Sequence, residues 1–99
     1  MPHVARMPAL LVAAALALAA CAGAPVQEMS NARQAIRAAR DAGAERTAPQ
    51  KLNEAEALLN RAEDSLERRA YREARRSAIA ARDKAAEALD SAQPGSNTG

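Results

Sequence analysis

The sequence predicts an all-α protein, built from a short helix followed by a long helical hairpin with alanine-rich heptad packing. Ala, Arg, Glu and Leu dominate the chain after residue 21, and all four are strong helix formers. Apolar residues recur there in alternating steps of three and four, which places them on one side of a helix. No stretch has the alternation of period two that is typical of strands. One long helix in place of the hairpin is the alternative architecture.

Three apolar stripes define the three expected helices. They consist of Met29, Ala32, Ile36, Ala39 and Gly43, of Leu52, Ala55, Leu59, Ala62 and Leu66, and of Tyr71, Ala74, Ala78, Ala81, Ala85 and Ala88. Because each stripe keeps to one side of its helix, we expect the helices to pack along these stripes. The many alanines predict a close approach, near the lower limit of about 8 Å for ordinary helix spacing.

The breaks between the stripes are marked by residues that end or begin helices. Gly43 suits a helix C-terminus, and Pro49 suits the first turn of the following helix. The second and third stripes are out of register, since continuing the second in strict heptads reaches charged residues. A turn within residues 68–70 accounts for this and favours the hairpin, whereas a stutter would leave one long helix. Pro94 is expected to stop the last helix.

The first twenty residues differ from the rest and are typical of a secretory signal. Residues 1–6 contain the basic Arg6, whereas residues 7–20 carry no charge and are almost wholly apolar. This apolar segment is shorter than the roughly 20 residues that a membrane-spanning helix needs. We therefore expect residues 1–20 to be a signal peptide that is removed on export.

The end of the apolar segment reads Leu18-Ala19-Ala20-Cys21, which resembles the lipobox of bacterial lipoproteins. The resemblance implies a diacylglyceryl group on the Cys21 thiol and cleavage between Ala20 and Cys21, with no other cofactor. Cys21 is the only cysteine, so no internal disulfide can form, and lipidation would block an otherwise unpaired thiol. The alternative is ordinary signal cleavage after Ala17-Leu18-Ala19, which leaves that thiol free.

The resemblance to lipoproteins also bears on location. Lipoproteins held in the inner membrane often have Asp after the cysteine, and this chain has Ala22. The resemblance therefore implies a lipid anchor in the outer membrane, with the protein on its periplasmic face in the cell envelope.

The mature chain is expected to divide into three parts. A tether at residues 21–27 contains small residues and Pro25, and a disordered tail at residues 93–99 is rich in Pro, Gly, Ser and Asn. The helical domain lies between them, at residues 28–92.

The helical domain resembles a family of bacterial domains of unknown function, number 4398. The residues that carry the resemblance are Ala35, Ile36, Ala39, Gly43, Ala44, Ala48, Pro49, Leu52, Ala55, Leu59, Ala62, Leu66, Tyr71, Ala74, Ala78, Ala81 and Ala85. Members often have a Gly-Asp-like turn before the tyrosine, where this chain has Arg69-Ala70. The family occurs in small envelope lipoproteins and beside OmpA-like domains, so the resemblance implies an envelope location and supplies no activity.

An enzyme is not expected from these residues. The mature chain has no histidine and no Gly-rich phosphate loop, and the serines of the helical domain lack a candidate general base: Ser30, Ser65, Ser77 and Ser91. The acidic residues Glu63, Asp64 and Glu67 are clustered, but they lack the loop spacing of a calcium site. We therefore expect neither a metal nor a small-molecule substrate.

Charge is unevenly distributed along the mature chain. The second helix is acidic through Glu54, Glu56, Glu63, Asp64 and Glu67, and the following segment is basic through Arg68, Arg69, Arg72, Arg75 and Arg76. On one continuous helix the five arginines fall within an arc of about 120°, which also contains Ile79. Two interpretations are a solvated face, with Ile79 covered by the first helix, and a docking patch for a phosphate-bearing lipid or an acidic protein. Nucleic acid is not an expected partner, because the protein is exported and lacks stacking aromatic residues.

These observations predict a non-enzymatic lipoprotein of the cell envelope, a membrane-anchored helical module for structure or interaction. The mature chain has few apolar residues larger than alanine, so its core is small and self-association or a protein partner is expected. The alternative function is a binding module for an anionic envelope ligand, namely lipopolysaccharide, phospholipid or peptidoglycan, through the arginine-rich face.

Overall fold

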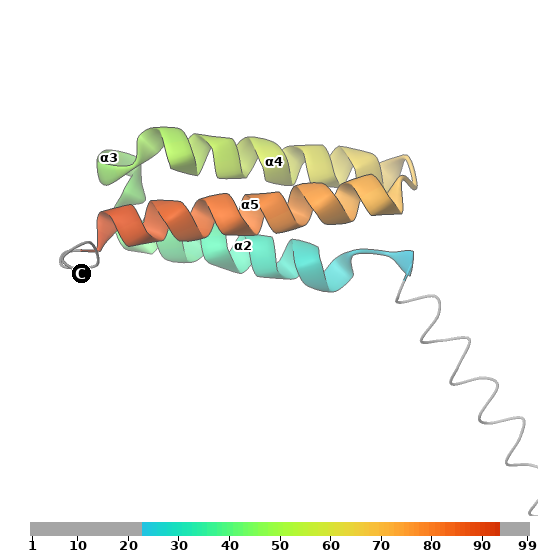
Figure 1. The fold of residues 1–99 in the computed structure, drawn as a ribbon, viewed down its shortest axis with the longest axis horizontal. Coiled ribbons are helices and arrows are strands. Elements are labelled where there is room, and N and C mark those ends of the chain that lie inside the picture. The colour runs from blue at the N-terminus through green and yellow to red at the C-terminus, as the bar shows by residue number, and fades with distance from the viewer. Residues whose placement is uncertain (1–22, 94–99) are drawn as a thin grey trace, which may run out of the picture.

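The structure is a computed structural model that describes residues 23–93, and these residues form a small all-α bundle. The helices are α2 (Val26–Asp41), α3 (Ala44–Thr47), α4 (Pro49–Glu67) and α5 (Tyr71–Ala92). The three longer helices lie side by side, and α3 forms part of the connection between α2 and α4 (Figure 1). The expected hairpin of α4 and α5 is therefore confirmed, and the alternative of one long helix is wrong.

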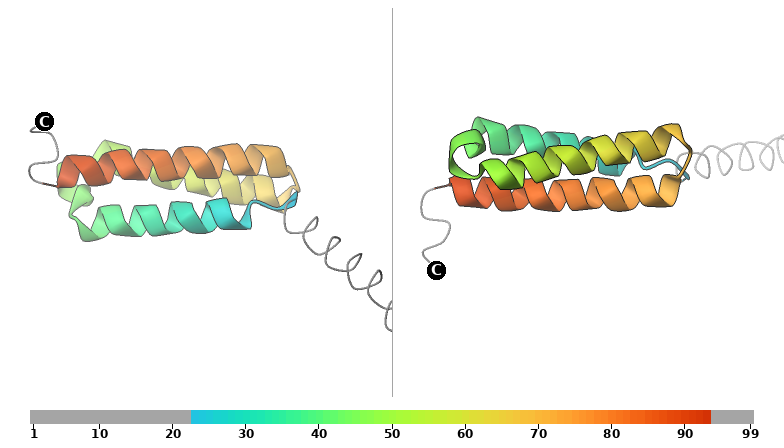
Figure 2. Two further views of the ribbon diagram at one scale, coloured as in Figure 1. Left: turned by 60° about the horizontal axis from the view of Figure 1, so that its bottom comes forward. Right: turned by 90° about the horizontal axis from the view of Figure 1, so that it is seen from above.

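Helix α5 is the centre of the packing. It contacts both α2 and α4 extensively, whereas α2 and α4 contact each other less. The chain runs up and down, so α5 is antiparallel to α4 and parallel to α2 (Figures 1 and 2). The start of α2 and the connection between α4 and α5 consequently lie at one end of the bundle, and α3 and the end of α5 lie at the other (Figure 2).

The core is built mostly from alanine methyl groups. The larger apolar side chains that are buried are Met29, Ile36 and Leu52, and the alanines that are buried are Ala32, Ala39, Ala44, Ala48, Ala55, Ala62, Ala74, Ala78, Ala81, Ala85 and Ala88. The predicted stripes thus form most of the core, since all their members except Gly43, Leu59, Leu66 and Tyr71 are buried. Small side chains allow the close helix approach that an alanine stripe predicts.

The stripes differ from the prediction at the end of the bundle that contains residue 23. Leu66 is only half-buried, and Ser65 is 1% exposed in its place. The two positions are separated by about 100° around a helix, so the buried side of α4 turns toward α5 near its end. Tyr71 is 36% exposed because it is the first residue of α5 and lies at the end of the bundle.

The helices begin two residues before the predicted start of the helical domain at residue 28. Helix α2 begins at Val26, and Pro25 directly before it is fully buried. Pro25 also accepts the first hydrogen bond of the helix, through its carbonyl oxygen, from the Met29 N–H at 3.0 Å. Helix α5 ends at Ala92. Pro94 and most of the predicted tail lie outside the described residues.

The connection between α2 and α4 is bounded by the two residues that the sequence marks, Gly43 after the end of α2 and Pro49 at the start of α4. Gly43 has a φ of 89°, in the left-handed region that glycine adopts without a steric penalty. Its N–H donates to the carbonyl oxygen of Arg40 at 2.9 Å and so closes the last turn of α2. Pro49 is the first residue of α4, where its missing N–H leaves no helix hydrogen bond unmade.

The connection between α4 and α5 is a Schellman turn with an arginine in the position that glycine usually occupies. The Ala70 N–H donates to the carbonyl oxygen of Ser65 at 2.8 Å, and the Arg69 N–H donates to that of Leu66 at 2.9 Å. Arg69 has a φ of 61°, and within residues 23–93 it is the only residue other than glycine with a positive φ. The sharp turn therefore forms although the sequence lacks a glycine there.

Candidate functional site

The lipidation site predicted at Cys21 and the cleavage site after Ala20 lie outside the described residues. The chain enters the described part at Gly23, which lies against the ring of Tyr71. A Cβ atom added to Gly23 would be 3.8 Å from Cδ2 of Tyr71. The start of the described chain therefore lies at the connection between α4 and α5, although the two are distant in sequence (Figure 1).

The five arginines predicted as one helical face do not share a helix. Arg68 is the C-cap of α4 and Arg69 lies in the turn, whereas Arg72, Arg75 and Arg76 belong to α5. The predicted arc of about 120° assumed a continuous helix, so it is wrong for the first two residues. The turn instead gathers all five around one end of the bundle.

The arginines differ in their partners. Arg68 Nη2 lies 2.9 Å from Asp64 Oδ2, in a pair whose side chains are both more than 60% exposed. Arg75 Nε lies 3.7 Å from Glu28 Oε2 and so connects α5 to α2. Arg69, Arg72 and Arg76 form no ion pair with any residue in the described part of the chain.

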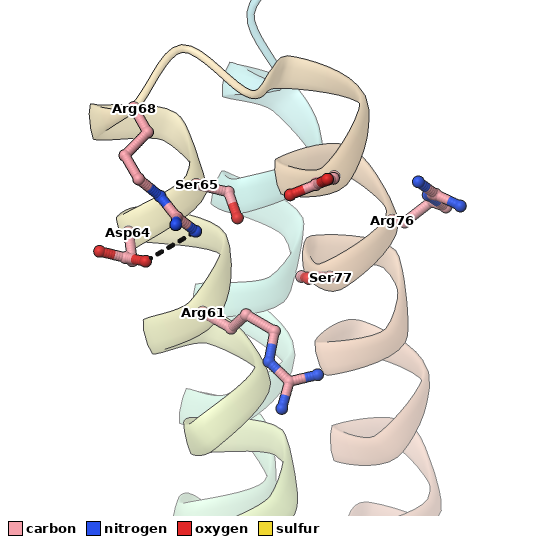
Figure 3. A pocket seen from close by; sticks show the side chains of 7 residues that line it. Arg61, Asp64, Ser65, Arg68, Arg76 and Ser77 are labelled. Carbon is pink, nitrogen blue, oxygen red and sulfur yellow. Dashed lines mark ion pairs between the residues drawn. The ribbon is translucent and has the colours of Figure 1, made fainter.

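An open groove between α4 and α5 lies next to this connection. It has a volume of about 490 Å³ and is lined by Arg61, Asp64, Ser65, Arg68, Glu73, Arg76 and Ser77. Arg61 extends from α4 into the space between the helices, and Arg76 points outward from α5 (Figure 3). Of the guanidinium groups that line the groove, that of Arg61 extends between the helices and that of Arg68 is paired with Asp64, so Arg61 is the one best placed to meet an oxyanion there.

Sequence reasoning did not place Arg61, Ser65 and Ser77 in this groove. In an antiparallel hairpin, residues equally distant from the turn lie opposite each other, as Arg61 and Ser77 do around Arg69. Once the turn is located, this symmetry predicts the facing pairs. The helical wheel cannot, because it describes one helix at a time.

One serine has a basic neighbour that the sequence did not suggest. Lys51 Nζ on α4 donates a hydrogen bond to Ser91 Oγ on α5 at 3.1 Å, and Ser91 in turn donates to the carbonyl oxygen of Glu87 at 3.0 Å. An ammonium group that donates cannot take a proton from the hydroxyl. The pair therefore connects two helices and is not arranged as a nucleophile with its base.

Residues 23–93 contain no group of three or more His, Cys, Asp or Glu residues placed to hold a metal ion. None of the helices described there is long and apolar enough to cross a membrane.

The fold and core define this protein as a small helical-bundle domain with an alanine core. The model of the family DUF4398, a domain of unknown function, matches residues 27–96, and the chain belongs to this family. The resemblance of the helical domain to this family is thereby confirmed, whereas the resemblance of residues 18–21 to a lipobox stays a prediction. Comparisons with curated proteins and with solved structures found no match.

Proposed function

We propose that this protein is a non-enzymatic lipoprotein of the cell envelope. In this proposal a lipid on Cys21 anchors the chain at the periplasmic face of the outer membrane, and the helical bundle serves as a structural or interaction module. The observation that carries the proposal is the lipobox-like Leu18-Ala19-Ala20-Cys21, which directly follows a short apolar segment. Two or three acyl chains would anchor the protein stably, where a single chain binds only marginally.

The entry of the chain into the bundle is compatible with a short anchor. Gly23 lies against Tyr71 and Pro25 is buried, so little free chain separates position 21 from the folded domain. Such a domain would work close to the membrane surface and not at the end of a long linker.

The surface of the bundle supports a role in interaction. Val26 is 66% exposed and Ile79 is 36% exposed, so two branched apolar side chains lie on the surface of the bundle. Ile79 was expected to be covered by the first helix if the arginine face were merely solvated, and α2 leaves it exposed. Both residues offer apolar contact to a protein partner or to a second copy.

Lipid labelling of the full chain in its native cells tests the anchor. The wild-type protein should incorporate a labelled fatty acid, and intact-mass measurement should show cleavage before Cys21 with the acyl groups added. Cys21→Ser should lose the label and keep its signal segment, because no thiol accepts the lipid. Unchanged labelling of Cys21→Ser, or a mature wild-type protein with a free thiol, would reject the proposal.

A second candidate function is binding of an anionic envelope ligand. It is favoured by Arg69, Arg72 and Arg76, which have no ion-pair partner within residues 23–93. Phosphate and carboxylate groups are suitable ligands, since the planar guanidinium binds either with two parallel hydrogen bonds.

A further inference from the structure

We propose that the end of the bundle at the α4–α5 connection lies against the membrane and contacts lipid phosphate groups through its arginines. We call this surface the arginine end and define it by Arg68, Arg69, Arg72 and Arg76. The inference rests on the proposed function for the anchor at Cys21 and names the surface of the domain that the anchor brings to the bilayer.

Covalent connectivity is the first argument. Gly23 lies against Tyr71 at the arginine end. Two peptide units separate Cys21 from Gly23, so their Cα atoms are at most about 7 Å apart. The lipid-bearing residue is therefore held beside the α4–α5 connection and cannot reach the other end of the bundle. Helix α5 has 22 residues and is about 33 Å long, which separates the two ends.

The distribution of charge is the second argument. Residues 68–76 contain five arginines and one acidic residue, Glu73. The connection at the opposite end, residues 41–47, contains Asp41, Glu45 and Arg46 and is slightly acidic. The bundle thus gathers five arginines at the end where the anchor enters, beside the acidic residues Glu28, Asp64 and Glu67. Clustered cations next to a membrane anchor favour binding to anionic lipid surfaces.

The conformation of Arg69 is the third argument. Its φ of 61° is unfavourable for any residue with a Cβ atom, and glycine would fit the turn better. A cation nevertheless occupies this exposed position at the tip of the hairpin. A strained residue at an exposed tip indicates a function for its side chain.

Tyr71 and the groove complete the surface. Tyr71 is the only aromatic residue of the chain and is partly exposed at the same end. Tyrosine suits the boundary between water and lipid, because its ring is apolar and its hydroxyl is polar. The neighbouring groove offers the Arg61 guanidinium and the Ser77 hydroxyl to a phosphate that approaches between α4 and α5.

The test uses the full lipidated protein, purified in detergent and reconstituted into vesicles. One set of vesicles is phosphatidylcholine, and in the other about one third of the lipid is anionic phosphatidylglycerol. Because Cys21 carries the lipid, a cysteine introduced at Glu67→Cys, beside the arginine end, or at Glu45→Cys, at the far end, is the single reactive thiol. A dye on that cysteine reports its closeness to a quencher on the lipid headgroups.

The dye at position 67 should be quenched more on anionic than on neutral vesicles, and the difference should disappear in about 1 M salt. The dye at position 45 should give the same low quenching on both. Arg69→Glu with Arg72→Glu should remove the difference in quenching at position 67 between anionic and neutral vesicles. Each arginine that is neutralised should lower the equilibrium constant for docking on the anionic surface about fivefold. Arg37→Glu with Arg46→Glu makes the same change in net charge away from this end and should leave the difference intact.

Folding and anchoring are controlled separately. Arg69→Gly with Arg72→Gln removes two charges and gives the turn the glycine that it prefers. This variant should also abolish the difference in quenching at position 67 between the two vesicle types. Equal quenching of position 67 on both vesicle types, or an equal effect of the two charge-reversed variants, would overturn the inference. If the proposed anchor itself is wrong, the protein will not float with neutral vesicles at all, and this outcome is distinct from an anchored protein without a preferred end.

Discussion

Lys84 on α5 and Glu54 on α4 form an ion pair across the hairpin, with 3.5 Å between Nζ and Oε2. Lys84 Nζ also lies 3.4 Å from Oε2 of Glu87, one turn further along α5. The hydrogen bond to Glu87 is the largest cause of a raised pKa of Lys84, and the charge of Glu87 and the hydrogen bond to Glu54 add to it. At neutral pH the ammonium group therefore connects α4 to α5.

The raised pKa of Lys84 predicts a loss of stability at high pH. Below the ordinary value of 10.5 the lysine is charged in the folded and the unfolded chain, so its full contribution is present. The contribution disappears as pH rises through the higher pKa of the folded state. The difference in the free energy of unfolding between wild type and Lys84→Met, measured in urea, should therefore shrink above pH 10.5. A difference that grows with pH would contradict the raised pKa.

The alanine core predicts that a larger side chain is tolerated at an exposed position of α5 and not at a buried one. Ala81 is fully buried in α5, so Ala81→Leu should overpack the bundle and lower the free energy of unfolding by about 1 to 3 kcal/mol. Ala86 is exposed on the same helix, and Ala86→Leu should change stability by less than about 0.5 kcal/mol. Thermal unfolding followed by circular dichroism compares the two variants. Equal losses would mean that the alanine stripe is not a tight interface.

The left-handed conformation of Arg69 predicts a stabilising substitution. Arg69→Gly should raise the free energy of unfolding by about 1 kcal/mol, because glycine adopts a positive φ without a steric penalty. The matched variant Arg72→Gly lies in the first turn of α5 and should lower stability, by less than the roughly 1 kcal/mol that glycine costs in a helix interior. Urea unfolding of both variants checks the sign. Destabilisation by Arg69→Gly would show that the Arg69 side chain contributes to the fold itself.

The residue after the proposed lipidated cysteine predicts the destination of the protein. Ala22→Asp should move the protein from the outer to the inner membrane, if it follows the sorting rule that its resemblance to lipoproteins implies. Ala22→Ser is the matched control and should leave the distribution unchanged. Separation of the two membranes on a density gradient, followed by detection of the protein, measures the outcome. An unchanged distribution of Ala22→Asp would argue against that rule for this chain.

Much of the fold followed from the spacing of small residues. The stripes through Ala32, Ala55 and Ala81 are buried as predicted, because helical periodicity is a local property that the chain displays directly. Helix α3 was not predicted, since four residues are too few to show a period. The burial of Pro25 was also missed, because it depends on how α2 packs against the rest of the bundle.

The candidate site was less accessible to sequence reasoning. The arginines at 68 and 72 were recognised as a charged run, but their grouping around a bundle end depends on the turn at Arg69. The nearness of Gly23 to Tyr71 joins segments that are far apart in the chain, and no local pattern contains that information. Such long-range contacts come from the packing of α2 along α5 and were visible only in the assembled bundle.

A core made of methyl groups has a thermal consequence. The heat-capacity change of unfolding comes mainly from apolar surface that becomes exposed to water. Most buried side chains of this bundle are alanines, each of which exposes little such surface when the chain unfolds. The heat-capacity change per residue should therefore fall below the usual value of about 12 to 15 cal/mol/K. The stability curve of the bundle is then broad and shallow, so its free energy of unfolding changes little over the range of temperatures at which a cell grows.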